Sequence, residues 1–152
     1  MNMDNFDKAI LRQLQINNQL STQQIGENIG LSATACQRRL KKLRSSSLIE
    51  KEVAILNTEA IDSCVSLIVN IVMKQGSSEY IQRFKQIMTA QPAIQQCFYV
   101  TGESDFILVI CVPNMQHFEQ LTQALFLDDE NILKFHSTVV MDTVKRGLNI
   151  PI

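Results

Sequence analysis

Residues 20–49 have the pattern of two short helices joined by a tight turn, which is typical of a helix-turn-helix. Ser21 and Gln24 have the spacing of a capping box at the start of the first helix, and Gly30 is suited to end it. Ser32 is placed to cap the second helix, whose apolar residues recur on one side. A second helix of this kind enters the major groove of DNA, so the motif predicts a DNA-binding chain.

The second helix is unusually basic for this chain. It carries five Lys and Arg residues and no acidic one, although the net charge of the whole chain is -1. A helix that is only solvated usually mixes both signs, whereas DNA reading needs cations for phosphates and donors for base edges. Arg39 lies near the edge of the apolar side, where it suits an ion pair within the chain as well as a phosphate. The expected DNA-contacting residues are Thr34, Gln37, Arg38, Lys41, Lys42 and Arg44.

Charge is divided unevenly along the chain. Residues 1–52 contain eight Lys and Arg against five Asp and Glu, whereas residues 53–152 contain six against ten. A basic segment attached to a larger acidic one indicates that the first meets nucleic acid and that the second has another role.

Length and composition are those of a folded chain. It has 152 residues, of which 45% are hydrophobic, enough for one medium core or two small ones. No apolar run approaches the roughly 18 residues that a membrane helix needs, and the first residues are acidic, unlike those of a signal peptide. We therefore expect a cytoplasmic, nucleoid-associated protein without membrane contact.

The four cysteines are widely spaced and stand among apolar neighbours. No Cys-x-x-Cys pair is present, and a cytoplasmic chain rarely keeps disulfides. We therefore expect reduced, buried thiols at Cys36, Cys64, Cys97 and Cys111.

Further elements are expected on either side of the motif. Asp4 and Asp7 can cap a preceding helix, which would complete a three-helix unit. Residues 48–56 alternate weakly and predict a short two-stranded wing, although its turn near Lys51 has neither Gly nor Asn. The core face of the preceding helix is expected to consist of Phe6, Ile10, Leu11 and Leu14.

From residue 65 the apolar pattern predicts four strands and two helices in the order βαββαβ. That order is typical of a ferredoxin-like domain, in which both helices cover one face of an antiparallel sheet. The whole chain is therefore assigned to the α+β class. The strands are expected at residues 65–73, 94–101, 106–112 and 133–141, and the helices around residues 80–88 and 115–125.

Both faces of the predicted sheet are apolar. In the first strand Leu67 and Val69 alternate with Ile68, and in the third strand Leu108 alternates with Ile107. Two helices cover only one face, so the other is expected to pack against the same sheet of a second chain. Such a homodimer would also offer one recognition helix to each of two half-sites.

Several segments spread over the chain share the pattern of one known family. They are the three-helix start, the Gly30-Leu31-Ser32 turn, Arg39 with Leu43, Asn57, residues 100–106 and residues 112–115. Together they resemble the Lrp/AsnC family of feast/famine, leucine-responsive regulators. The resemblance implies a winged helix-turn-helix domain at residues 1–60 and, at residues 61–152, a RAM domain that binds ligand and oligomerises. Members form dimers, which often assemble into octamers of four dimers and bind amino acids between dimers.

Three positions depart from the family pattern. Ser47 and Lys51 stand where or near where members commonly have Gly, and Ala33 stands where many have Pro. A residue with a side chain is strained in the left-handed conformation that Gly adopts after a helix. We therefore expect the end of the recognition helix to close differently here.

The residues of the turn between the second and third strands suit a ligand that carries both a carboxylate and an ammonium group. Gly102 permits close backbone approach, turn amides can hold a carboxylate, and Asp105 or Glu103 can accept the protons of an ammonium group. A plain hairpin turn, in which Asp105 binds the loop's own amides, explains the same residues. The resemblance favours an effector site here, lined also by the last strand of a neighbouring subunit. The expected effector-binding residues are Thr101, Gly102, Glu103, Ser104, Asp105, Thr138, Val139 and Val140.

Catalysis is not expected. Spacing implies no Ser or Cys partner for His117 or His136, and the sequence has neither a phosphate loop nor a metal-ligand cluster, so we expect no cofactor and no metal. The expected function is a DNA-binding regulator of transcription that responds to a free amino acid. One alternative is an architectural protein that bridges or wraps DNA without a ligand. Another, an enzyme-type domain with a structural head, is disfavoured by the basic helix.

Overall fold

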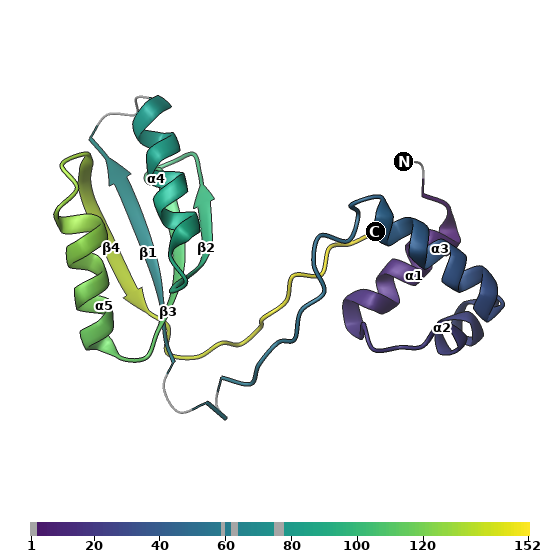
Figure 1. Ribbon diagram of the computed structural model, residues 1–152. Coiled ribbons are helices and arrows are strands. Elements are labelled where there is room, and N and C mark those ends of the chain that lie inside the picture. The colour runs from purple at the N-terminus through teal and green to yellow at the C-terminus, as the bar shows by residue number, and fades with distance from the viewer. Residues whose placement is uncertain (1–2, 59, 62–63, 75–77) are drawn as a thin grey trace. The chain divides into compact units, whose positions relative to one another are not determined.

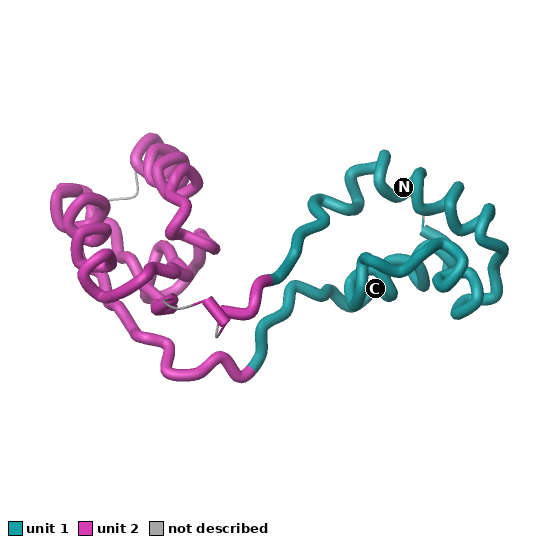
Figure 2. The backbone as a smooth tube through the Cα atoms, turned by 60° about the horizontal axis from the view of Figure 1, so that its bottom comes forward, with its two compact units in different colours: residues 1–55, 145–152 teal, residues 56–144 magenta. Residues whose placement is uncertain are grey.

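The computed structural model describes residues 3–58, 60–61, 64–74 and 78–152, and the chain divides into two compact units (Figures 1 and 2). We call residues 1–55 with 145–152 the head, and residues 56–144 the sheet domain. The sequence placed a boundary after residue 60. In the structure the connecting segment changes unit at residue 55, and the end of the chain belongs to the head.

In the described part of the head, three helices are formed, and each begins at a cap that the sequence predicts. The backbone N–H of Asp7 donates to Asp4 Oδ1 (2.9 Å), and that of Gln24 donates to Ser21 Oγ (3.2 Å). Ser32 caps the third helix in the same way. These bonds satisfy N–H groups that a helix start otherwise leaves unpaired. The helices are α1 (Asn5–Ile16), α2 (Thr22–Ile29) and α3 (Ala33–Ser45).

The head has a small core where the apolar sides of its three helices meet. Phe6 departs from the expectation, because its ring is 40% exposed and lies beneath the guanidinium of Arg39, 5.5 Å from the ring centroid. Leu11 and Leu14 are only partly buried against this core. The buried hydrophobic residues of the head are Ile10, Ile25, Cys36, Leu40 and Leu43.

A residue with positive φ, the conformation that glycine adopts most easily, lies on each side of α3. Gly30, in the turn before it, has φ 74°, as expected of a residue that ends a helix in the left-handed conformation. After α3, Ser47 has φ 59°. The expectation that this helix end closes differently was therefore wrong: Ser47 adopts the left-handed conformation despite its side chain.

The two-stranded wing expected at residues 48–56 is not formed. These residues contain bends and irregular backbone but no strand, and Val53 and Ile55 are 65% and 74% exposed. The physical reason is local, since a two-residue hairpin needs Gly or Asn at its turn and Lys51 supplies neither.

The end of the chain is bound to α1, which the sequence did not predict. Arg12 Nε donates to the carbonyl of Ile152 (2.6 Å), and Gln15 Nε2 donates to that of Ile150 (3.1 Å). In return, the N–H of Ile150 donates to Gln15 Oε1 (2.7 Å), and Asn149 Nδ2 donates to the Gln15 carbonyl (3.1 Å). Residues 145–152 therefore have the colour of the head in Figure 2.

The sheet domain has the predicted βαββαβ order and an antiparallel sheet with strand order β2-β3-β1-β4. The second and fourth strands end two residues earlier than expected. The second helix stripe is divided, because α5 continues as a π-helical turn. The elements are β1 (Val65–Met73), α4 (Ser78–Ala90), β2 (Ile94–Tyr99), β3 (Phe106–Val112), α5 (Met115–Thr122), η1 (Gln123–Leu127) and β4 (Ile132–Val139).

One face of the sheet carries both helices and the core (Figure 1). Leu67 and Leu108 lie on that face with no exposure, and Phe84 of α4 packs on it. The alternate residues form what we call the open face, where Ile68 is 39% exposed and Phe98 is 48% exposed. Its apolar residues, by strand alternation and register, are Ile68, Val72, Phe98, Ile107 and Val109.

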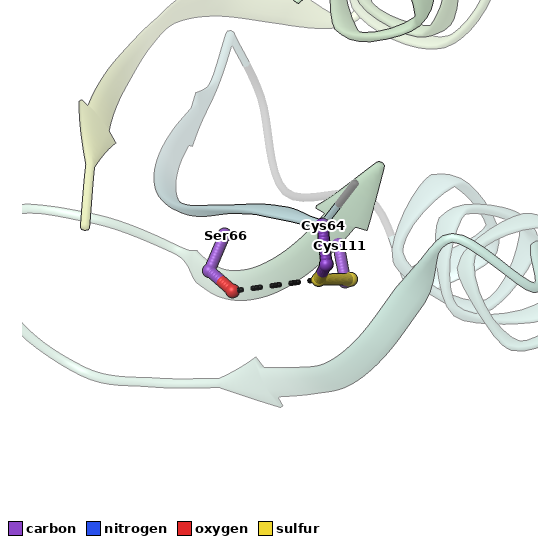
Figure 3. Close-up of a disulfide and its surroundings, with 3 residues drawn as sticks. All are labelled: Cys64, Ser66 and Cys111. Carbon is purple, nitrogen blue, oxygen red and sulfur yellow. Dashed lines mark hydrogen bonds between the residues drawn. A yellow bond between two sulfur atoms is a disulfide. The ribbon is translucent and has the colours of Figure 1, made fainter. Parts of the chain in front are cut away.

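The cysteines correct one expectation. Cys36 and Cys97 are free, as predicted, but Cys64 and Cys111 form a disulfide with their Cα atoms 5.9 Å apart (Figure 3). Spacing concealed this pair, because its members have a sequence separation of 47 while β1 and β3 are paired neighbours. In the described part of the chain, no helix has both the length and the apolar character needed to cross a membrane.

Candidate DNA-binding and effector sites

The six residues expected to contact DNA lie on one exposed side of α3. Cys36, Leu40 and Leu43 point into the head core and fix the rotation of the helix. Thr34 and Gln37 therefore lie exposed near its start, where a recognition helix reads bases. The other exposed residues of the set are Arg38, Lys41, Lys42 and Arg44.

Of the two roles expected for Arg39, an ion pair within the chain and a phosphate contact, the structure shows the ion pair. Its Nη1 lies 2.7 Å from Asp4 Oδ2 and 2.7 Å from Asp7 Oδ1, so it joins α3 to the start of α1. The hydrogen bond to Asp7, and after it the weaker effect of the hydrogen bond to Asp4, raise the pKa of Arg39 above its ordinary value. The pKa of Asp4 is lowered, chiefly by the N–H of Asp7 and further by Arg39. Arg39 therefore contributes to the fold of the head, and its neighbour Arg38 does not share these partners.

Arg44 has a partner that DNA would have to replace. Its Nη2 lies 2.8 Å from Glu52 Oε1 in the connecting segment. For Arg38, Lys41 and Lys42, the part of the chain that the structure describes offers no ion pair. The cationic side of α3 is thus divided into three unpaired charges and one that is already neutralised.

An open hollow of about 630 Å³ lies beside this side of α3. Gln37, Lys41 and Arg44 line it from α3, and Thr22 lines it from the first turn of α2. Helix starts present N–H groups and a positive dipole end, which suit phosphate oxygens. Thr22 was not identified from the sequence. The signal was the Ser21 cap, which places Thr22 at the first position of α2.

The Gly102 turn is held to the end of β1 by Asp105. The N–H of Asp105 donates to the Ile71 carbonyl (2.8 Å), and its Oδ2 accepts from the N–H of Met73 (2.7 Å). Gly102 has φ 125°, a conformation that favours glycine, and no described atom beyond the glycine and its two chain neighbours lies within 4 Å of where a Cβ would stand. Asp105 therefore has a structural role, although its partner is the end of β1 and not the loop's own amides. Thr101, Gly102 and Glu103 remain exposed.

The second group of expected effector residues lies at the other end of the sheet. Val139 pairs with Leu67 near the start of β1, and the N–H of Val140 donates to the Ser66 carbonyl (2.9 Å). Asp105 adjoins Ile71, so about 13 Å of strand lies between the two groups. One chain does not bring them together. Thr138, paired with Ile68, belongs to the same distant group.

The histidines show no catalytic arrangement. His117 Nδ1 lies 2.8 Å from Asn114 Oδ1 at the cap of α5, and His136 is exposed on β4. Across the described residues, no group of three or more His, Cys, Asp and Glu side chains could hold a metal ion.

Comparisons with known proteins match both units. Residues 3–44 match the family model of the AsnC-type helix-turn-helix domain, and residues 66–150 match that of the Lrp/AsnC ligand binding domain. An uncharacterised HTH-type transcriptional regulator of Sinorhizobium fredii is 37% identical over the whole chain, which covers 90% of that protein. The leucine-responsive regulatory protein of Escherichia coli is 28% identical over 95% of this chain and 88% of its own length.

Solved structures agree in fold. A crystal structure of an AsnC family transcriptional regulator from Agrobacterium tumefaciens is similar with a TM-score of 0.90 and 27% identity, covering 98% of this chain and 97% of that one. A Neisseria meningitidis transcriptional regulator, crystallised in complex with L-Met, also has a TM-score of 0.90, with 24% identity over 99% of this chain and 97% of that one. Both similarities extend over the head and the sheet domain.

Proposed function

Since the chain belongs to the Lrp/AsnC family of transcriptional regulators, we propose that it binds operator DNA through α3 in a sequence-specific manner and that a free amino acid changes its assembly or its DNA binding. The homologues are regulators and not enzymes, and we assign no catalytic step, cofactor or metal. The site of action is the cytoplasm, at the nucleoid, because that is where the DNA of a bacterial regulator lies.

The observation that carries the DNA-binding proposal is the contrast between Arg38 and Arg39. Arg39 is used by the fold, whereas Arg38, Lys41 and Lys42 are exposed and have no ion pair in the described chain. Exposed cations on one helix face can neutralise DNA phosphates, and the release of the counterions of those phosphates favours binding. Gln37 and Thr34, nearer the helix start, supply donors for base edges.

The open face supports a homodimer as the working unit. Ile68 on the central strand β1 and Phe98 on the edge strand β2 expose large apolar surfaces, and a second copy of the same face would cover them. We further propose that four such dimers form an octamer, in which the Gly102 turn of one dimer meets Thr138, Val139 and Val140 of another. This arrangement would join the two groups that one chain holds apart.

The proposed effector is an amino acid. Its carboxylate would bind the amides of the turn at Gly102, and its ammonium group would face Glu103 or the remaining acceptor capacity of Asp105. Two solved relatives with the same fold, from Neisseria meningitidis and Mycobacterium tuberculosis, are complexes with L-methionine. An apolar side chain is therefore the first class to test.

The DNA-binding proposal is tested by fluorescence anisotropy with a palindromic duplex over a salt series. A dimer that neutralises about six phosphates should give a slope of log K against log salt near -5. Arg38→Ala with Lys41→Ala should flatten that slope and weaken binding, and Arg38→Ala alone should cost about 1–3 kcal/mol at the base it reads. Arg83→Ala, at an exposed position of α4, is the matched control. Wild-type affinity in the double variant would refute the proposal.

The effector proposal is tested by calorimetry with each of the twenty amino acids at millimolar concentration. We expect heat and a change in sedimentation for at least one of them, and loss of both in Gly102→Val, whose side chain would block the turn. Glu79→Val on α4 controls for a new exposed valine. No heat and no change for any amino acid would favour the architectural, DNA-bridging alternative.

A further inference from the structure

The Cys64–Cys111 disulfide occupies one end of the open face (Figure 3). Cys111 is paired in register with Ser66 and alternates with Ile110 and Val112, which face the helices. Its side chain therefore lies in the same row as the open-face residues of β3. Cys64 directly precedes β1, where the segment from the head enters the sheet, and Ser66 Oγ lies 4.0 Å from its Sγ.

The other two cysteines differ from this pair in their surroundings. Cys36 is 1% exposed inside the head core, and burial raises the pKa of its thiol. Burial likewise raises the pKa of Cys97, which lies on the helix-covered side of β2. The thiolate is the reactive form, so both are poor nucleophiles. Cys64 and Cys111 are half-buried on a surface that a free protomer leaves open.

We propose that Cys64 and Cys111 form a reversible regulatory disulfide, which exchanges with low-molecular-weight disulfides and sets how tightly two copies associate through the open face. The inference rests on the proposed homodimer. In the cytoplasm, stable disulfides are rare, and those that form are usually redox-sensing or catalytic. Two thiols held close on a functional surface fit the first of these roles.

The exchange proceeds in two balanced steps. The thiolate of one cysteine attacks a sulfur of a small disulfide RSSR, which forms a mixed disulfide and releases one thiolate RS⁻. The second protein thiolate then attacks the protein sulfur of the mixed disulfide and releases the second RS⁻. The protons of the two protein thiols pass to the released thiolates. Overall the protein dithiol is oxidised to a disulfide and RSSR is reduced to two RSH.

Oxidation acts on assembly by ordering the edge of the interface. The disulfide ties residue 64 to β3, so the start of β1 is held in place before a second copy arrives. Association then loses less conformational freedom, and the oxidised chain should dimerise more tightly. By linkage, dimerisation must favour the oxidised form to the same extent. At a fixed ratio of thiol to disulfide, the oxidised fraction should therefore rise with protein concentration.

The full chain is tested by equilibration over a series of ratios of reduced to oxidised glutathione. Differential alkylation and mass spectrometry should show Cys64 and Cys111 titrating together while Cys36 and Cys97 stay free. Sedimentation should give a dimer Kd about tenfold lower for the oxidised chain. Because the disulfide closes a loop with a sequence separation of 47, the sheet domain should also melt at least about 5 °C higher when oxidised.

Three variants show which cysteines cause the response to the glutathione ratio. Cys64→Ser and Cys111→Ser should each hold the chain in its reduced behaviour at every ratio, whereas Cys97→Ser, a matched half-buried cysteine, should respond as the wild type does. A pair that stays reduced, or stays oxidised, over the whole series would overturn the inference, as would Kd values that agree within twofold between the two states. A monomer in both states would instead refute the proposed dimer, which distinguishes the two failures.

Discussion

The head and the sheet domain are stabilised in different ways. Among the described residues, the head buries five hydrophobic side chains in its core, against thirteen in the sheet domain. The head adds to its small core a set of caps and the ion pairs of Arg39, which tie α3 to α1. A small core contributes little to the free energy of unfolding, so polar contacts supply a larger share of that free energy in the head.

The comparison extends to buried charge. The head buries the carboxylate of Asp7, while the buried polar residue of the described sheet domain is the uncharged Thr122. Arg39 Nη1 compensates Asp7 at 2.7 Å, and Thr122 Oγ1 donates to the Glu119 carbonyl at 2.9 Å. The head should therefore respond to single substitutions more strongly than the sheet domain does.

The largest effect is expected on the open face, through which we propose that two chains pair. Ile107→Asp should leave the sheet folded but prevent dimerisation, because a symmetric interface would bury two unpaired carboxylates at several kcal/mol each. Sedimentation equilibrium measures the Kd of the dimer, and Gln86→Asp, at an exposed position of α4, is the control. A dimer of wild-type affinity in Ile107→Asp would show that another surface mediates assembly.

Core truncations test whether the two cores are independent. Leu43→Ala in the head and Leu108→Ala in the sheet domain each remove a side chain that is at most 1% exposed, and each should cost about 2–5 kcal/mol. In the head this cost should be enough to unfold α1 to α3 at 25 °C, while the sheet keeps its native spectrum. Two-dimensional NMR resolves the two units. Joint unfolding of both units in Leu43→Ala would contradict separate cores.

The Arg39 network should make head stability depend on pH. The pKa of Asp4 is below its ordinary value of 3.8 in the folded chain, so its contribution is fully present above that value and is lost as the pH falls through the folded pKa. Arg39→Gln should lower the thermal stability of the head at pH 7, and Arg38→Gln, one residue away, should not. Below about pH 4 the difference in thermal stability between Arg39→Gln and wild type should become smaller. If the difference in thermal stability between Arg39→Gln and wild type does not change with pH, the ion pairs of Arg39 are not its source.

The smallest expected effect concerns the end of α3. Ser47→Gly should stabilise the head by about 1 kcal/mol, because Ser47 has φ 59° and glycine adopts that conformation without strain. Ser45→Gly, inside the helix, should destabilise it by about 0.5 kcal/mol. Urea denaturation followed by circular dichroism measures both. Destabilisation in Ser47→Gly would mean that the serine side chain makes a compensating contact.

Local signals in the sequence predicted most of the head. Caps at Asp4, Ser21 and Ser32 and the glycine at position 30 are read from adjacent residues, and the structure confirms each of them. The failures came where local signals are weak or absent. The wing has no turn residue to specify it, and the contact between α1 and Ile150 joins residues that no periodicity relates.

The sheet domain was predicted through alternation, which gives the strands and their faces but not contacts across strands. β1 and β3 were found with their observed limits, yet the Cys64–Cys111 pair depends on the register between them. The Asp105 carboxylate was expected to act in the turn, and its bond to the N–H of Met73 needed the same register. The expected DNA and effector residues stay predictions.

The separation of the Gly102 turn from Val139 along β1 has a consequence for how such a regulator would report on its surroundings. A binding site that two dimers must complete responds to the product of two concentrations, that of the amino acid and that of the protein itself. The half-saturating amount of effector would then fall as the cell makes more of the regulator. The protein would thus act as a coincidence detector, insensitive to nutrient while scarce and sharply responsive once abundant.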